Sequence, residues 1–173
     1  TMRPFGLVPA VFLAAACKGI GGPSPVTSVL RDRQGVDIGR VNVLEKNGLT
    51  MYSFGVAQTS LDKEANRKLF EFARLMDIKL IIVEPGSVEI WDNLEELVKE
   101  YDIRVAVHNH NLNTVYGNPF TVKAILHGRD PRIGVCLDVG WVTAAGFDAA
   151  KVFTEYGDRV FDIHLKDKTV ELS

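Results

Sequence analysis

The chain of 173 residues is long enough for one domain with a real core, and its 46% hydrophobic and 24% charged residues are ordinary for a folded globular protein. A net charge of −2, spread along the chain without a basic patch, excludes the electrostatic pattern of a nucleic-acid-binding protein. The 2 cysteines are too few for a disulfide scaffold, and no unbroken apolar stretch reaches the roughly 18 residues of a membrane-spanning helix.

The first part of the chain differs from the rest. Arg3 is followed by an apolar run that closes with small residues before Cys17. These features are typical of a secretory signal and are similar to a bacterial lipoprotein cleavage site, although a buried strand or a disordered leader fits equally well. Residues 19–25 are rich in Gly and Pro and predict a linker. We expect an irregular segment over 1–43, one domain over 44–173, and a cytoplasmic location, or export if the apolar run is a signal.

Strand and helix patterns alternate from about residue 49 onward. Apolar runs typical of strands begin near positions 49, 78, 103, 133 and 160, about one every 28 residues. Between them, apolar residues recur every three or four positions, as in helices that bury one face. A strand–helix unit at this interval predicts parallel strands with right-handed crossovers, which fits either a (β/α)8 barrel or an open doubly wound sheet.

Capping residues bound the expected helices. Thr59 or Ser60 is expected to start the first helix, Ser87 the second, Asn118 with its following proline the third, and Asp148 the fourth. The stripes expected to be buried are, on the first helix, Leu61, Ala65, Leu69, Phe72 and Met76, and on the second, Ile90, Trp91, Leu94, Leu97, Val98 and Tyr101.

A short apolar strand ends abruptly in His108-Asn109-His110. Residues two apart on a strand share a face, so His108 and His110 are expected to point the same way. Two histidines after a strand are also common in plain loops, but other strands end in similar residues, namely Glu84, Asp138 and His164. Carboxyl ends of parallel strands are where such folds place their chemistry.

These strand ends favour the barrel and predict a metal site. No glycine-rich phosphate loop follows any expected strand, which argues against a nucleotide-binding open sheet. Imidazoles and carboxylates together suit a divalent cation such as Mn, Co, Zn or Mg. Glu84 is a candidate base, with a solvated strand-end carboxylate as the alternative, and Lys166 a candidate positive charge near a substrate oxygen. The candidate metal ligands are His108, His110, Asp138 and His164.

Three segments carry a resemblance to a known family. They are 107–110 (Val-His-Asn-His), 132–140 (Arg-Ile-Gly-Val-Cys-Leu-Asp-Val-Gly) and 162–167 (Asp-Ile-His-Leu-Lys-Asp). In this order and spacing the chain resembles the sugar phosphate isomerase/epimerase family of xylose-isomerase-like TIM barrels, over roughly residues 44–170. The resemblance implies a (β/α)8 barrel with outer helices and a divalent metal at its carboxyl end. It also implies transfer of protons and hydrogens between neighbouring carbons of a small sugar or sugar phosphate.

The resemblance assigns positions within that site. His108 occupies the place of the family's fifth-strand ligand, usually a glutamate, with His110 two residues on. Asp138 matches the sixth-strand carboxylate ligand, and His164 matches the seventh-strand histidine ligand. Lys166 belongs to the family's His-Leu-Lys-Asp signature.

Departures from the family pattern predict an incomplete barrel. Trp141 stands where the pattern has a histidine. The sequence ends at Ser173, just after the strand that matches the family's seventh, so we expect the family's eighth strand with its metal-binding glutamate to be missing. Residues 1–43 do not resemble the first two strand–helix units. We therefore expect an open or incomplete sheet, reduced activity, and edge strands that favour a homo-oligomer.

Functions of different classes remain open from the sequence. The first is a metal-dependent sugar or sugar phosphate isomerase or epimerase, with activity impaired by truncation. The alternative is a non-catalytic sugar-binding or interaction domain that kept the scaffold and lost ligands. The third is an abasic-site nuclease of the same superfamily, but DNA affinity rests on neutralising phosphates and the chain is slightly acidic. We expect no nucleic-acid partner and no membrane-spanning segment.

Overall fold

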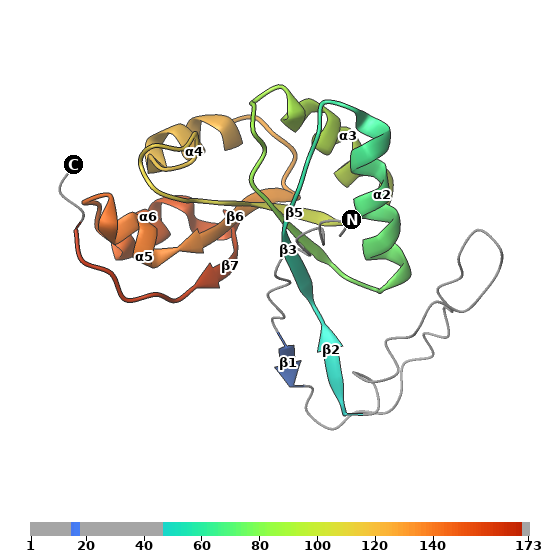
Figure 1. Cartoon of the computed structure of the whole chain (residues 1–173), viewed down its shortest axis with the longest axis horizontal. Coiled ribbons are helices and arrows are strands. Elements are labelled where there is room, and N and C mark those ends of the chain that lie inside the picture. The colour runs from blue at the N-terminus through green and yellow to red at the C-terminus, as the bar shows by residue number, and fades with distance from the viewer. Residues whose placement is uncertain (1–14, 18–46, 171–173) are drawn as a thin grey trace, which may run out of the picture.

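The computed structural model describes residues 15–17 and 47–170 (Figure 1). Its centre is a curled parallel sheet with the strand order β3-β4-β5-β6-β7. The strands are β3 (Ser53–Ala57), β4 (Leu80–Val83), β5 (Arg104–His108), β6 (Ile133–Asp138) and β7 (Val160–His164). Neighbours in the sheet are consecutive in the chain, as in a barrel, whereas a doubly wound sheet reverses its order. The predicted α/β fold, a partial (β/α)8 barrel, is confirmed.

Helices connect the strands and lie around the outside of the curled sheet (Figure 1). They are α2 (Lys63–Leu75), α3 (Ile90–Tyr101), α4 (Pro119–Leu126), α5 (Val139–Ala144) and α6 (Ala149–Tyr156), with a 3-10 turn η1 (Gly157–Arg159) before β7. Within the described ranges, no helix has the length and apolar character needed to cross a membrane. The outermost strands β3 and β7 each pair with one neighbour in this sheet, and homo-oligomer formation through them stays a prediction.

Little of the N-terminal segment is described. Strand β1 (Ala15–Cys17) pairs antiparallel with β2 (Leu49–Met51), so these three positions are extended rather than irregular. The rest of the expected 1–43 segment, with its signal-like run and linker, lies outside the described residues. The cellular location and the domain boundary at 44 stay predictions.

Alternate residues of each strand face opposite sides of the sheet. One side packs against the helices and forms the main core. The other side, the inner face of the half-barrel, carries a smaller apolar cluster that includes Ile82, Ala106 and Cys136. Two residues further along the same strands are Glu84, His108 and Asp138. The inner rows therefore change from apolar to polar at the carboxyl end of the sheet.

Half of the predicted helix starts are confirmed. The side chains of Asn118 and Asp148 accept backbone N–H groups at the starts of α4 and α6. Helix α2 instead follows Asp62, later than the two hydroxyl residues expected. Helix α3 begins at Ile90, and Ser87 does not cap it. The first turn of α2 is polar, and bends and turns at 86–89 precede α3, so periodicity alone does not locate either start.

The buried face of α2 also differs from the prediction. Leu61 lies before the helix and is 65% exposed, and Phe72 is 39% exposed. The buried residues are Asn66, Phe70 and Ala73. The Asn66 side chain accepts a hydrogen bond from the backbone N–H of Ser60 at 2.8 Å and donates one to its carbonyl at 2.7 Å. These two bonds hold the Asn66 face of α2 against the rest of the molecule. An apolar periodicity does not detect such an anchor. The predicted stripe of α3 is confirmed, except that Tyr101 is only partly buried.

Candidate metal centre

His108, Asp138 and His164 meet where the neighbouring strands β5, β6 and β7 end. One ligand atom of each lies within 4.8 Å of the others. Nε2 of His108 is 3.3 Å, and Nδ1 of His164 is 3.7 Å, from the same Oδ2 oxygen of Asp138. Strand register brings them together, because Asp138 pairs with His164 across β6 and β7. Three of the four predicted ligands therefore form one cluster.

Asp138 is a buried charge surrounded by donors. Its side chain is fully buried, and burial alone would raise its pKa, but hydrogen bonds from His108, His164 and Lys166 outweigh this and hold the pKa well below its ordinary range. Nζ of Lys166 is 2.5 Å from Oδ2. The backbone N–H of Trp141 donates to Oδ1 at 3.1 Å, so Asp138 also caps α5. This environment is built for an ionised carboxylate facing positive charge.

The imidazole of His108 lies between two carboxylates. Nε2 faces Asp138, and Nδ1 is 3.7 Å from Oε2 of Glu84. Burial lowers the pKa of His108, but the two carboxylates outweigh burial and raise it above the ordinary value. Nδ1 is buried, and no hydrogen-bond partner for it occurs among the described residues. In metal sites a carboxylate that is hydrogen-bonded to the second ring nitrogen orients the histidine ligand, and Glu84 lies near that position, at 3.7 Å.

His110 lies apart from this cluster. Its ring packs on Trp141 with centroids 4.4 Å apart, and its centroid is 6.0 Å from that of His108. The cluster of ligand atoms within the described residues does not include it. Its role as a metal ligand stays a prediction. Trp141, at the position where the family pattern has a histidine, covers His110 and contributes its backbone N–H to Asp138.

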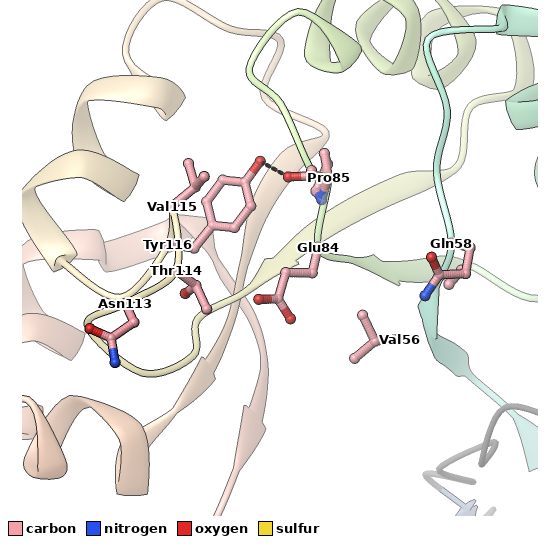
Figure 2. A pocket seen from close by; sticks show the side chains of 10 residues that line it. Val56, Gln58, Glu84, Pro85, Asn113, Thr114, Val115 and Tyr116 are labelled. Atoms are coloured by element: carbon pink, nitrogen blue, oxygen red, sulfur yellow. Dashed lines mark hydrogen bonds between the residues drawn. The ribbon is translucent and has the colours of Figure 1, made fainter.

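Glu84 joins the cluster to a cavity of about 500 Å³. The cavity lies between the ends of β3 and β4 and the loop at residues 113–116, and Figure 2 shows the Glu84 carboxylate between Thr114 and Val56. Polar lining comes from Gln58, Glu84, Asn113 and Thr114. The described lining residues include no lysine or arginine. Among the described residues that line the cavity, Glu84 is therefore the only charged one, and its charge is negative.

Asn109 is a site residue that the sequence analysis did not single out. It is 3% exposed, its Nδ2 donates to the Asp138 carbonyl at 3.1 Å, and its Oδ1 accepts the Asp138 N–H at 2.8 Å. These two bonds fix the backbone of β6 at the metal cluster. The middle residue of His-Asn-His points away from its neighbours, toward the buried side, where a polar group needs partners. A polar residue at a buried position of a strand is therefore the feature of the sequence that could have identified Asn109.

Tyr116 supports the wall of the cavity from the core. Its hydroxyl donates to the Pro85 carbonyl at 2.7 Å (Figure 2) and accepts from Nε1 of Trp91 at 3.1 Å. Burial raises its pKa to about 12. Because the folded pKa lies above the ordinary value of 10.0, the neutral hydroxyl stabilises the fold below pH 10 and this contribution is lost as pH rises toward 12.

We expect Tyr116→Phe to lower the free energy of unfolding at pH 8 by about 2 kcal/mol, because it leaves a buried N–H and a buried carbonyl unpaired. Urea unfolding at pH 8 and pH 11 measures the effect, and the difference from the unaltered chain should shrink at pH 11. Tyr52→Phe, at a hydroxyl on a 37% exposed residue, is the control and should change stability by less than about 0.5 kcal/mol. An equal loss in both variants would contradict the role of Tyr116.

The donor chemistry of the cluster fits a divalent cation. Two imidazoles and an ionised carboxylate are typical ligands of such ions. Two ligand atoms on one ion are roughly 3–3.5 Å apart, because each is about 2.1 Å from the metal. The separations of 3.3 Å and 3.7 Å around Asp138 approach this spacing.

Comparison with known proteins places the chain in a family. Residues 40–173 match the family model described as xylose isomerase-like TIM barrel. The chain belongs to this family. The predicted recognition is confirmed, and the half-barrel agrees with the TIM-barrel fold of this family.

Solved structures support the same fold. An uncharacterised protein of Parabacteroides distasonis is 34% identical, with a TM-score of 0.60, over 71% of this chain and 48% of its own. A D-tagatose 3-epimerase-like protein is 16% identical, with a TM-score of 0.58, over 73% of this chain and 59% of its own. The probable 3-DHS dehydratase AsbF from Bacillus anthracis is 15% identical, with a TM-score of 0.59, over 73% and 54%.

The last two similarities show the fold alone, because their identities are low. This chain spans about half the length of the solved structures that it matches. No curated protein matches it.

Proposed function

We propose that this chain carries the metal-binding part of a divalent-metal-dependent sugar isomerase or epimerase, with Mn, Co, Zn or Mg as the metal. The supporting observation is the cluster of His108 and His164 around the buried oxygen of Asp138, beside a cavity that Glu84 lines. Proteins of the same fold include one described as D-tagatose 3-epimerase-like and one described as a probable 3-DHS dehydratase.

Each residue has a distinct role in this proposal. His108, Asp138 and His164 would hold the ion, which when bound supplies a Lewis acid for a substrate oxygen. The carboxylate of Glu84 faces the cavity and would take a proton from the carbon beside a carbonyl. In an isomerisation that proton would be returned to the carbonyl carbon while the hydroxyl proton passes to the carbonyl oxygen, and in an epimerisation the same carbon would be protonated again from its other face. The ammonium of Lys166 would stabilise the negative charge that develops on oxygen after the proton leaves.

The cavity favours an unphosphorylated sugar over a sugar phosphate. Amide, hydroxyl and carboxylate groups from Gln58, Thr114 and Glu84 suit the hydroxyl groups of a sugar, and Val56 suits its carbon skeleton. A phosphate would face the negative charge of Glu84 without a guanidinium or ammonium among the described lining residues.

Proton exchange tests the proposed reaction. Small ketoses and aldoses, with and without a phosphate group, are incubated in D2O with the purified chain and Mn²⁺, and deuterium at carbon is measured by NMR. We expect exchange into an unphosphorylated sugar, and a loss of about 100-fold or more in Glu84→Gln, which removes the base. Glu96→Gln, at a carboxylate that is 64% exposed on α3, is the matched control and should exchange like the unaltered chain.

Exchange that survives Glu84→Gln would contradict the role of Glu84. Binding of metal and sugar without any exchange would favour the alternative, a non-catalytic sugar-binding domain. Trp141 in place of the family's histidine is the observation that keeps this alternative open.

A further inference from the structure

We propose that Lys166 and the metal ion compete for the same oxygen of Asp138, so that metal binding releases the Lys166 ammonium from it. The inference rests on the proposed metal site. It assigns Lys166 a second role, as the internal cation that neutralises Asp138 when no metal is bound.

The contacts around Asp138 converge on one atom. Oδ2 is 2.5 Å from Nζ of Lys166, while the ring nitrogens of His108 and His164 reach the same Oδ2 at 3.3 Å and 3.7 Å. The lysine is therefore the positive group nearest to the oxygen around which the candidate ligands gather. A divalent ion bound to Oδ2 would lie beside the ammonium, and two positive charges so close in a buried site repel each other strongly.

The two partners differ in their freedom to move. Asp138 is fully buried and anchored by Asn109 and by the backbone of Trp141, whereas the Lys166 side chain is 44% exposed. When the Lys166 ammonium leaves Asp138 it can be hydrated by solvent, whereas the buried Asp138 carboxylate cannot move into water. We therefore expect the metal to displace Lys166 and not to move Asp138.

The chain is shaped to bring Lys166 to this position. A Cβ atom added at Gly140 would be 2.6 Å from Cβ of Lys166, so only glycine lets the segment after β7 approach the start of α5 this closely. Two residues on, Nζ of Lys168 lies 3.3 Å from the ring centroid of Trp141. This second contact keeps the segment beside the site, where a released Lys166 would remain close to substrate.

Competition lowers apparent metal affinity, because only the fraction of molecules with Oδ2 free of the ammonium is ready to bind. We expect Lys166→Met to bind Mn²⁺ or Zn²⁺ at least about tenfold more tightly than the unaltered chain, as measured by isothermal titration calorimetry. Lys166→Arg keeps the charge and should bind as weakly as the unaltered chain. Lys151→Met removes one positive charge from an exposed position on α6 and should leave the affinity unchanged.

A second measurement uses the unaltered chain and does not depend on folding of the variants. The rate of lysine acetylation is followed by mass spectrometry with and without Mn²⁺. Release from Asp138 should raise the rate at Lys166 severalfold, while Lys151 serves as an internal reference with a constant rate.

The outcomes separate the metal site from the competition between Lys166 and the metal. If Lys166→Met binds the metal no more tightly than the unaltered chain, and acetylation of Lys166 does not change, the competition is contradicted but the metal site is not. If neither the unaltered chain nor any variant binds metal, both the metal site and the competition are contradicted.

Discussion

Asp138→Asn should abolish the rise in melting temperature that Mn²⁺ or Zn²⁺ gives the unaltered chain. An ion at 100 times its Kd stabilises the folded state by about 2.7 kcal/mol, which is about 5–10 °C for a domain of this size. Asp138 supplies the negative charge of the cluster and the oxygen that both histidines face. Its loss should therefore weaken metal binding by at least about 100-fold.

The same substitution should also lower the free energy of unfolding without metal, by about 2 kcal/mol, because charged hydrogen bonds from Lys166 and His108 are lost. Asp158→Asn makes the same chemical change at an exposed position in η1, and it should keep both the stability and the metal-induced shift. A full thermal shift in Asp138→Asn would place the metal elsewhere.

Gly134→Ala should destabilise the fold by about 3 kcal/mol, because there is no room for a methyl group. A Cβ at Gly134 would be 2.4 Å from the carbonyl oxygen of Arg159 and 2.5 Å from the ring of Phe161. The carbonyl is held in place, since the Arg159 side chain donates to the Ile133 and Asp130 carbonyls at 2.6 Å and 2.8 Å. Strand β7 cannot move away from β6 without breaking these bonds.

Gly86→Ala is the matched control, because no atom lies within 4 Å of its added Cβ. Its stability in urea should differ from that of the unaltered chain by less than about 0.5 kcal/mol. A Gly134→Ala variant as stable as this control would show that the approach of β7 to β6 is looser than described.

The fold and the centre of the site could be predicted because both depend on local patterns. Apolar strands at a regular interval predict parallel order, and four of the five end in a polar residue that is a candidate for the site. Parallel order then brings the ends of neighbouring strands together, which is how His108, Asp138 and His164 form a cluster.

The rest depends on partners that are distant in sequence. The contact of Lys166 with Asp138 requires the close approach at Gly140, and no pattern in the chain indicates it. Helix α5 was not expected, because residues 139–144 mix glycine and β-branched residues, and its start depends on the Asp138 carboxylate acting as a cap. His110 has the spacing of a ligand, yet its ring packs on Trp141, which lies on the neighbouring unit.

Anomalous diffraction from crystals of the full chain grown with Mn²⁺ tests the metal centre most directly. We predict one strong anomalous peak within coordination distance of His108, Asp138 and His164, with Nζ of Lys166 moved away from Oδ2 of Asp138. Crystals at millimolar Mn²⁺ that show no peak at these three residues would contradict it.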